Sequence, residues 1–446
     1  MATKASYWVA RWFCGNSRVQ AGTSRMPTCP QNHQPRDSRR IKLGRSCSQR
    51  ADDSGMEPES PRTAHKRIEF DLSVPAPNGL RRGLTTGTCA TAATQAALRL
   101  WLGESVPQEV KVDLPEGNYF VRVPIERVQQ FTDVCTEASV IKDAGDDPDV
   151  THGSRVRVQL KAEGTGIQFS AGSGVGTITK QGFSLPIGEP AINPVPRQMM
   201  IQTILETLEA YPQHRSQGFT VIVGIDEGEQ LADKTYNPRL GIVGGLSVLG
   251  TKGIVEPKSL ASWLASIELY VRIALADDAK AIVLAPGNIG QLVAEQQLGL
   301  TPERVVPMAN FIGFALNAVD QELGDHHRKL EKLWLVGHPG KLAKILEDHW
   351  DTHSGVSPMA MEGILKLAKA FGVKPSLLEK CKSAKTVEAI IQQFGDTPKS
   401  SQFWQLVEQR ITNKIQPRLQ HVLEVQTLLF DMHRNPLGLP LTQSYE

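Results

Sequence analysis

Four aspartates, Asp143, Asp146, Asp147 and Asp149, lie within the short stretch KDAGDDPDVTHG, where their like charges should repel one another. A calcium loop of the EF-hand type needs a glutamate at its twelfth position, and Ser154 holds that position counted from Asp143. Two interpretations stay open. The stretch is either a solvated turn built from Asp, Gly and Pro, or a loop whose carboxylates bind ligand hydroxyls or cations.

A helix that could present anion-binding groups is predicted by TTGTCATAATQAALRLWLGE, residues 85–104. Threonine at the start suits an N-cap, and Gly103 suits the end. The first turn would offer backbone N–H groups beside Thr85, Thr86 and Thr88, and helix N-termini bind anions. Plain capping with a buried face of small residues is the alternative.

Strands of a mixed or antiparallel sheet are predicted at 110–114, 119–125 and 154–162, where apolar and polar residues alternate between turns. The acidic stretch connects two strands of this sheet. Two glycine-rich segments, 172–200 and 237–257, are too apolar for flexible linkers. Because glycine lets backbone approach a ligand closely, these segments are interpreted as extended, ligand-facing chain.

From residue 218 the pattern becomes apolar strand, glycine-containing loop and helix, the βα unit of a parallel sheet. Three units are GFTVIVGIDEGE, KAIVLAPGNIGQLV and KLWLVGHPGKLAKIL. Ligands bind at the carboxyl edge of such sheets. No P-loop motif occurs, and no G-x-G-x-x-G follows a strand. The loop residues expected together at this edge include Asp226, Glu227, Gly287, Asn288, Gly290 and His338.

The predicted fold class is α/β plus α+β with two main domains, an N-terminal mixed-sheet α+β domain and a C-terminal parallel-sheet α/β domain. The expected boundaries are a non-native or disordered extension at 1–55, the α+β domain at 70–215, the parallel-sheet domain at 216–372, and a helical region with a late strand at 373–446.

Charge and cysteine usage narrow the function classes. The whole chain has a net charge of +2, but residues 1–50 alone carry ten basic residues and one acidic residue. The rest of the chain is therefore mildly acidic and gives no reason to expect nucleic-acid binding. The segment 1–50 resembles a transit peptide, but the change in composition near Met56 favours an upstream start codon read into non-coding sequence.

No apolar run reaches transmembrane length. Six cysteines without a C-x-x-C pair predict a reducing cytoplasm and no protein-bound metal.

Several longer stretches occur in a recognisable order: TTGTCATAA, KDAGDDPDVTHG, GSGVGTITKQG with PIGEPAINPVPRQM, NPRLGIVGGLSVLGTKGIVEP, GHPGKLAKI and THSG. On them the chain from about Leu80 to Leu439 resembles the CbiD family, the cobalt-precorrin-5B C1-methyltransferases of anaerobic cobalamin biosynthesis. Pro339 stands where that family is expected to have an apolar residue such as Ile, and Gly355 where a larger residue is common. Neither departure removes a chemical group.

The resemblance implies methyl transfer from S-adenosylmethionine to C1 of a cobalt corrinoid, giving cobalt-precorrin-6A, without a metal bound by the protein. The implied partner is this small molecule; no nucleic acid or membrane is expected, and a homo-oligomer stays open. One alternative is a corrinoid-binding carrier or assembly partner without turnover. Another is a nucleotide-dependent transferase that uses GHPGK as a phosphate loop.

Site residues follow from this chemistry. Arginine and lysine bind carboxylates, so the corrinoid is expected at Thr85, Thr86, Thr88, Arg155, Lys180, Arg197, Arg239 and Lys252. S-adenosylmethionine is expected at the carboxyl edge of the parallel sheet, at Asp226, Glu227, Gly287, Asn288, Gly290 and His338, with the acidic stretch as the rival location. The expected catalytic residues are Asp143, Asp146, Asp147 and His152, and which of them is a general base stays open.

Overall fold

The computed structural model describes residues 67–438 of the chain. A five-stranded mixed sheet forms the centre of the first half of these residues. Its order is β5-β6-β7-β11-β8; β8 is parallel to β11, and all other neighbours are antiparallel. Alternating apolar residues bury one face of β7, as RVRVQLKA predicts. The strands are β5 (Arg127–Thr132), β6 (Cys135–Ile141), β7 (Arg155–Ala162), β8 (Ile167–Ala171) and β11 (Phe219–Ile225).

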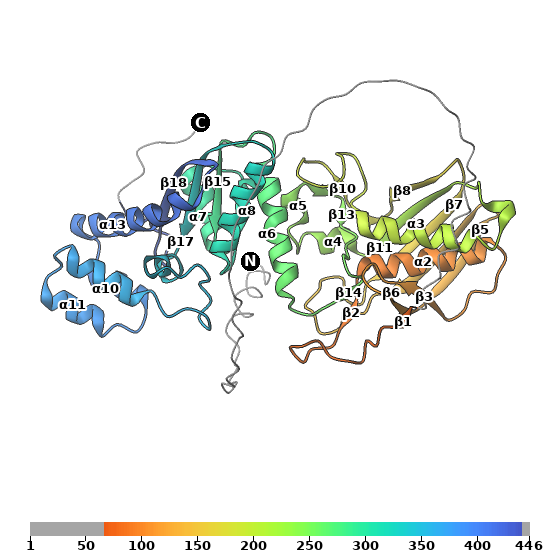
Figure 1. The fold of residues 1–446 in the computed structure, drawn as a ribbon, viewed down its shortest axis with the longest axis horizontal. Helices are drawn as coiled ribbons and strands as arrows, with labels where there is room; N and C mark the ends of the chain where they lie inside the picture. The colour runs from red at the N-terminus through yellow and green to blue at the C-terminus, as the bar shows by residue number, and fades with distance from the viewer. Residues whose placement is uncertain (1–66, 439–446) are drawn as a thin grey trace, which may run out of the picture. The chain divides into compact units, whose positions relative to one another are not determined.

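Helices α2 (Thr86–Trp101) and α3 (Pro194–Leu208) pack against each other, and α2 lies on β6 and β7 (Figure 1). Most of α2 is buried because its alanines let the helix lie close to the sheet. The hydroxyl of its N-cap, Thr85, accepts the Thr88 N–H, and Gly103 follows its end with a positive φ. The helix predicted from the sequence is confirmed.

Short paired segments complete the first half: a three-stranded sheet, β1-β4-β3, and the pairs β2-β14, β9-β13 and β10-β12. The last two pairs bring the glycine-rich segments together. The elements are β1 (Ile68–Glu69), β2 (Gly83–Leu84), β3 (Glu109–Asp113), β4 (Tyr119–Pro124), β9 (Gly174–Val175), β10 (Thr177–Ile178), β12 (Ile242–Val243), β13 (Gly245–Leu246) and β14 (Ile254–Val255).

Chain packing requires glycine in these paired segments. A Cβ atom on Gly174 would lie 2.0 Å from the Ile225 carbonyl oxygen, and one on Gly245 would lie 2.4 Å from the Gly174 carbonyl carbon. The two glycines therefore admit a neighbouring backbone segment, where the sequence analysis expected a ligand.

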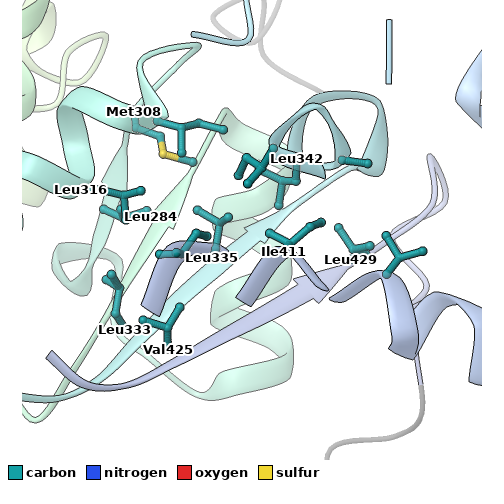
Figure 2. Packing of buried hydrophobic residues seen from close by; sticks show 14 of the residues in the cluster. Leu284, Met308, Leu316, Leu333, Leu335, Leu342, Ile411, Val425 and Leu429 are labelled. Atoms are coloured by element: carbon teal, nitrogen blue, oxygen red, sulfur yellow. The ribbon is translucent and has the colours of Figure 1, made fainter. Parts of the chain in front are cut away.

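A four-stranded parallel sheet, β16-β15-β17-β18, organises the second half of the described chain. Helices α6 and α8 pack on one face with Leu284, and α7 packs on the other with Val283 and Ala285. Figure 2 shows residues of the core on the face covered by α6 and α8, which also contains Leu335 and Ile411. The elements are β15 (Ala281–Ala285), β16 (Val305–Pro307), β17 (Leu330–Gly337), β18 (Val422–Leu429), α6 (Leu260–Leu275), α7 (Asn288–Leu298) and α8 (Ile312–Asp325).

Strand β11 is not part of this parallel sheet, so the prediction that GFTVIVGIDEGE forms its first βα unit is wrong. The segment is apolar on both faces, which fits a parallel strand and equally fits a strand held between β7 and β8. Asp226 and Glu227 consequently follow a different sheet from Gly287, Asn288 and His338. The single edge expected for all five residues does not form.

The C-terminal region is helical and returns to the parallel sheet through β18, the expected late strand. Residues 67–438 belong to one compact unit, so the division into two main domains stays a prediction. The fold is a mixed α/β structure with several sheets. The extension expected at 1–55 lies outside the described residues. The remaining elements are α4 (Gly228–Ala232), α5 (Asn237–Leu240), α9 (Pro339–Leu342), α10 (Met361–Ala370), α11 (Pro375–Lys382), α12 (Val387–Phe394), α13 (Pro398–Ile415), and the 3-10 turns η1 (Pro212–His214), η2 (Pro302–Arg304), η3 (Ala343–Glu347) and η4 (Gln416–Arg418).

Candidate functional site

The acidic loop, residues 142–154, connects β6 to β7 and binds Arg81. The Arg81 guanidinium donates to both carboxylate oxygens of Asp143, at 2.5 and 3.1 Å. The Arg81 N–H donates to the Asp146 carboxylate at 2.7 Å, and the Asp146 N–H returns a bond to the Arg81 carbonyl at 2.9 Å. The hydrogen bond from Arg81 is the main reason that the pKa of Asp143 lies below its usual value. One arginine thus compensates two of the four aspartates.

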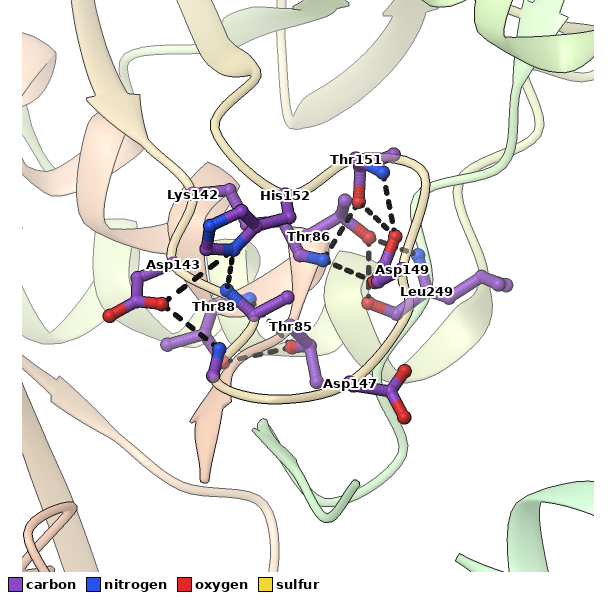
Figure 3. Close-up of polar contacts among 12 residues, drawn as sticks. Thr85, Thr86, Thr88, Lys142, Asp143, Asp147, Asp149, Thr151, His152 and Leu249 are labelled. Atoms are coloured by element: carbon purple, nitrogen blue, oxygen red, sulfur yellow. Dashed lines mark hydrogen bonds and ion pairs between the residues drawn. The ribbon is translucent and has the colours of Figure 1, made fainter. Parts of the chain in front are cut away.

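Lys142 fills the inside of the loop, with 1% of its side chain exposed (Figure 3). Its ammonium group donates to the Asp149 carboxylate and, at 2.7 Å, to the Thr151 hydroxyl. Burial raises the pKa of Asp149, but Lys142 and Thr151 lower it more, so that it lies below its usual value. Asp149 therefore holds the loop together. Sequence reasoning missed Lys142, because a lysine at the end of a strand usually lies on the surface.

Asp147 is the loop residue best suited to accept a proton. Asp147 is half-buried and accepts the Lys258 N–H at 3.0 Å; burial is the main reason that its pKa is raised, and the charge of Asp149 adds to it. His152 is 52% exposed, and its Nδ1 accepts the Ala144 N–H at 3.1 Å. That bond assigns the proton of the neutral ring to Nε2 and engages the lone pair of Nδ1, so neither ring nitrogen is free to accept a proton.

The first turn of α2 is bonded to residues 249–253 of the second glycine-rich segment. The Gly87 N–H donates to the Leu249 carbonyl at 2.8 Å, and the Leu249 N–H donates to the Thr86 hydroxyl at 2.9 Å. The Thr88 hydroxyl donates to the Gly253 carbonyl at 2.6 Å. The N–H groups of Gly87 and Thr88 already have partners within the protein. This geometry favours the capping interpretation over anion binding.

Arg155 and Asp226, which the sequence analysis assigned to different ligands, belong to one ion-pair cluster. Arg155 donates to Glu126 and, at 3.1 Å, to Asp226. Arg157 Nε lies 2.8 Å from the other Asp226 oxygen, as an ion pair without hydrogen-bond geometry. The pairing of β7 with β11 creates the cluster, because it places Val156 opposite Ile225. Two arginines thus neutralise Asp226.

Arg197 is engaged inside the protein. Its guanidinium donates to the Ile192 and Pro190 carbonyls at 2.8 and 2.9 Å and to the Glu189 carboxylate at 2.8 Å. The side chain is 17% exposed. These bonds hold the proline-rich turn before α3, so they favour a structural role.

The two lysines of the expected substrate site form ion pairs nearer the surface. Lys180 lies 3.1 Å from Glu303, with 35% of the lysine side chain exposed. Lys252 lies 3.7 Å from Glu116, with 58% exposed. Such pairs are weak enough for a ligand carboxylate to replace the protein carboxylate.

The second glycine-rich segment also reaches the N-terminus of α7. Arg239 donates to the Gln291 side chain at 3.1 Å, and the Tyr236 hydroxyl donates to the Asn288 side chain at 3.3 Å. Tyr236 and Tyr270, with ring centroids 5.5 Å apart, line a small cavity together with Arg239 and Gln291. The structure therefore brings together Arg239 and Asn288, which the sequence analysis assigned to substrate and cofactor. Tyr236 and Tyr270 were missed because they stand outside any motif, and Gln291 was missed because it follows the loop residues of its βα unit.

At the carboxyl edge of the parallel sheet, Gly290 and His338 have structural roles. A Cβ atom on Gly290 would lie 2.9 Å from the Val336 carbonyl oxygen, so glycine lets α7 approach β17. His338 Nδ1 accepts the Gly340 N–H at 3.0 Å, and Nε2 donates to Glu388 at 3.0 Å. Both ring nitrogens are engaged, and the Gly340 N–H that a phosphate loop would need is occupied. This geometry favours capping for His338.

Residues 67–438 also bear on other kinds of functional feature: membrane-spanning helices, metal-binding groups and reactive cysteines. No helix there is long and apolar enough to cross a membrane. No group of three or more His, Cys, Asp or Glu side chains in that range could hold a metal ion. The three described cysteines, Cys89, Cys135 and Cys381, are buried free thiols, and burial raises the pKa of Cys89 to about 12.

Comparison with known proteins finds two family models in the chain: CbiD over residues 74–257, and CbiD, C-terminal domain over residues 351–440. The cobalt-precorrin-5B C(1)-methyltransferase of Ralstonia nicotianae is 48% identical over 374 residues, 83% of this chain and 97% of the relative. That of Chromobacterium violaceum is 44% identical over 373 residues, 83% and 98%. A crystal structure of the cobalamin biosynthesis protein CbiD from Archaeoglobus fulgidus is 29% identical and covers 62% of this chain and 83% of that one, with a TM-score of 0.33.

Proposed function

The chain belongs to the CbiD family, and from that premise we propose that it methylates C1 of cobalt-precorrin-5B in cobalamin biosynthesis, giving cobalt-precorrin-6A. The observation that carries the proposal is the 48% identity to a cobalt-precorrin-5B C(1)-methyltransferase over 97% of that relative. S-adenosylmethionine is the proposed methyl donor, because an electron-rich ring carbon needs an electrophilic methyl group.

The reaction depends mainly on positioning. Holding two reactants in line contributes up to roughly 7–11 kcal/mol of the reduction in barrier. S-adenosylmethionine would supply the methyl group from its sulfonium. The protein must bind a flat macrocycle with carboxylate side chains, hold the donor beside it, and accept any proton that leaves the ring.

The corrinoid carboxylates are proposed to bind exposed cations. Lys252 suits this role best, since its side chain is 58% exposed and its ion pair with Glu116 is of the kind worth roughly 0–1 kcal/mol. Arg155 is 43% exposed, and it would bind a corrinoid carboxylate by exchanging one of its ion pairs with Glu126 and Asp226. Arg239 contacts Gln291 of α7 and is proposed to hold the corrinoid beside the donor. Arg197 is left out of the site, because its donors are bound within the protein.

Asp147 is the proposed proton acceptor, and His152 is left out of this role because its Nδ1 accepts the Ala144 N–H while its Nε2 carries the ring proton. A raised pKa brings a carboxylate closer to the range in which general bases work well. Asp143 and Asp146 are proposed to act through Arg81, which they bind, by holding the loop in place.

The donor is proposed to bind at the carboxyl edge of the parallel sheet, at Gly287 and Asn288. Ligands in open α/β sheets bind at the carboxyl edge where the strand order reverses, which in the order β16-β15-β17-β18 is beside β15, the strand before Gly287. The residues present fit the donor, since the half-buried Asn288 can bind hydroxyl and amino groups. Asp226 and Glu227 are not part of this proposal, because they follow the mixed sheet.

The test is an incubation of the full chain with cobalt-precorrin-5B and S-adenosylmethionine carrying a ¹³C-labelled methyl group. One added methyl by mass, located at C1 by NMR, is the expected result. A reaction without the donor is the control. Corrinoid that is bound but unchanged after prolonged incubation would contradict the proposal and favour a carrier.

A further inference from the structure

Asn310, just beyond β16, lies at the same edge as Gly287. Pro307 pairs with Ala285 across the two neighbouring parallel strands, and the Met308 N–H donates to the Ala285 carbonyl at 2.9 Å. Gly287 and Asn310 follow these residues in the two loops. The end of β16 therefore brings Asn310 to the edge where α7 begins.

The helices that follow these two strands leave the sheet on opposite faces. Helix α7 packs through Val293 in a core with Val283, whereas α8 packs through Leu316 in the core that contains Leu284 (Figure 2). Open α/β sheets bind ligands at the carboxyl edge where the strand order reverses, and in the order β16-β15-β17-β18 this point lies beside β15. Segment 350–352 bounds the β16 side, since the Thr352 N–H donates to the Asn310 carbonyl at 2.9 Å.

The carboxamide of Asn310 has no hydrogen-bond partner among residues 67–438, although the residue is only 4% exposed. The polar atoms of its side chain keep some access to solvent, so the carboxamide faces an opening. Buried polar groups in folded proteins nearly always have partners. A carboxamide that the protein leaves unbonded at an opening can bond water or a ligand there.

We infer that Asn310 binds the adenine ring of S-adenosylmethionine, an inference that rests on the proposed function. A carboxamide presents donors and an acceptor side by side, which match the N7 acceptor and N6 donor of adenine. Hypoxanthine has acceptors at both positions, so a carboxamide bonds only one of them well. Asn310 therefore selects the base of the donor, and Asn288 begins α7 after the neighbouring strand.

The test is isothermal titration calorimetry of the full chain with S-adenosylhomocysteine and with S-inosylhomocysteine. Wild-type protein should prefer the adenosyl ligand by roughly 5- to 150-fold. N310A should lose that preference together with affinity. N310D should bind the adenosyl ligand poorly, since a carboxylate cannot donate to N7. The matched control is N317A: Asn317 is an exposed asparagine of α8 that accepts from Arg418 at 3.4 Å, and its loss should change neither affinity.

Three outcomes separate this inference from the proposed function. Equal affinity of wild-type protein for the two ligands would overturn the inference without any variant. N310A with wild-type affinity and preference would do the same, while methyl transfer by the wild type would leave the proposed function standing. A wild-type protein that binds neither ligand and transfers no methyl would remove both. Thermal unfolding of N310A should match the wild type, because the carboxamide has no partner to lose.

Discussion

The ammonium group of Lys142 lies against the carboxylate of Asp149 inside the acidic loop, with 1% of the lysine side chain exposed. This buried pair explains how one loop carries four aspartates. Two of the others bind Arg81, and Asp147 has a raised pKa. The loop is therefore a folded unit that leaves one carboxylate suited to accept a proton.

Removing Lys142 should destabilise the protein strongly. K142M leaves Asp149 without its charged partner, and breaking a buried ion pair costs about 3–5 kcal/mol. Urea unfolding at neutral pH measures the change. The matched control is K252M, which removes an exposed partner of Glu116 and should cost about 0–1 kcal/mol. Similar losses for the two variants would contradict the structural role of Lys142.

The pH dependence of stability should contain a contribution from Asp149. Its pKa is lowered in the folded protein, so its ionisation stabilises the fold above the usual value of 3.8, and this stability is lost as the pH falls through the lower folded value. D149N should therefore flatten the decrease in unfolding free energy below about pH 4. Urea unfolding across that range tests this, and an unchanged slope would count against it.

Asp147 should contribute to the pH dependence of stability with the opposite sign to Asp149, and its replacement should also lower kcat. Its raised pKa means that ionisation disfavours the fold as the pH rises from 3.8 through the higher folded value. D147N should be at least as stable as the wild type at neutral pH, while kcat falls about 10²- to 10⁴-fold if the carboxylate is the base. D325N, at an exposed position of α8, is the control. Full activity of D147N would assign the base elsewhere.

Arg197 and Arg155, both expected from the sequence to bind the substrate, should differ in their roles: Arg197 stabilises the fold, and Arg155 binds the corrinoid. R197Q removes donors from three internal acceptors and should lower the free energy of unfolding by about 1–3 kcal/mol, with the corrinoid KM unchanged. R155Q should raise the KM roughly tenfold, which corresponds to about 1.4 kcal/mol. Unfolding curves and initial rates on both variants test this. The reverse pattern would show that Arg197 binds the substrate.

His338 should prove structural. H338A removes the side chain that caps α9 and contacts Glu388, which should cost about 0.5–2 kcal/mol of stability. Affinity for S-adenosylhomocysteine should stay at the wild-type value, in contrast to N310A. Weaker binding at unchanged stability would instead return His338 to the cofactor site.

Local patterns were sufficient for several parts of the fold. The α2 helix and the alternating strand β7 are encoded by runs of neighbouring residues, and the sequence predicts both. Strand β11 is different, because a segment apolar on both faces fits either sheet and only its pairing with β7 and β8 decides between them.

Site residues were harder to predict, because their roles depend on distant partners. Arg155 meets Asp226 across 71 positions of the chain, and Arg81 meets Asp143 across 62. The sequence shows the charges but not these pairs, so it cannot separate cations used within the fold from those open to a ligand. Asn310 carries no motif, and its unpaired carboxamide becomes visible only when its burial and contacts are known.

The most direct measurement is a single-turnover reaction with the full chain in excess over cobalt-precorrin-5B and with S-adenosylmethionine carrying a labelled methyl group. One labelled methyl per corrinoid, attached at C1, is the predicted result. Stoichiometric binding of the corrinoid with no label transferred would contradict the account and identify the protein as a carrier.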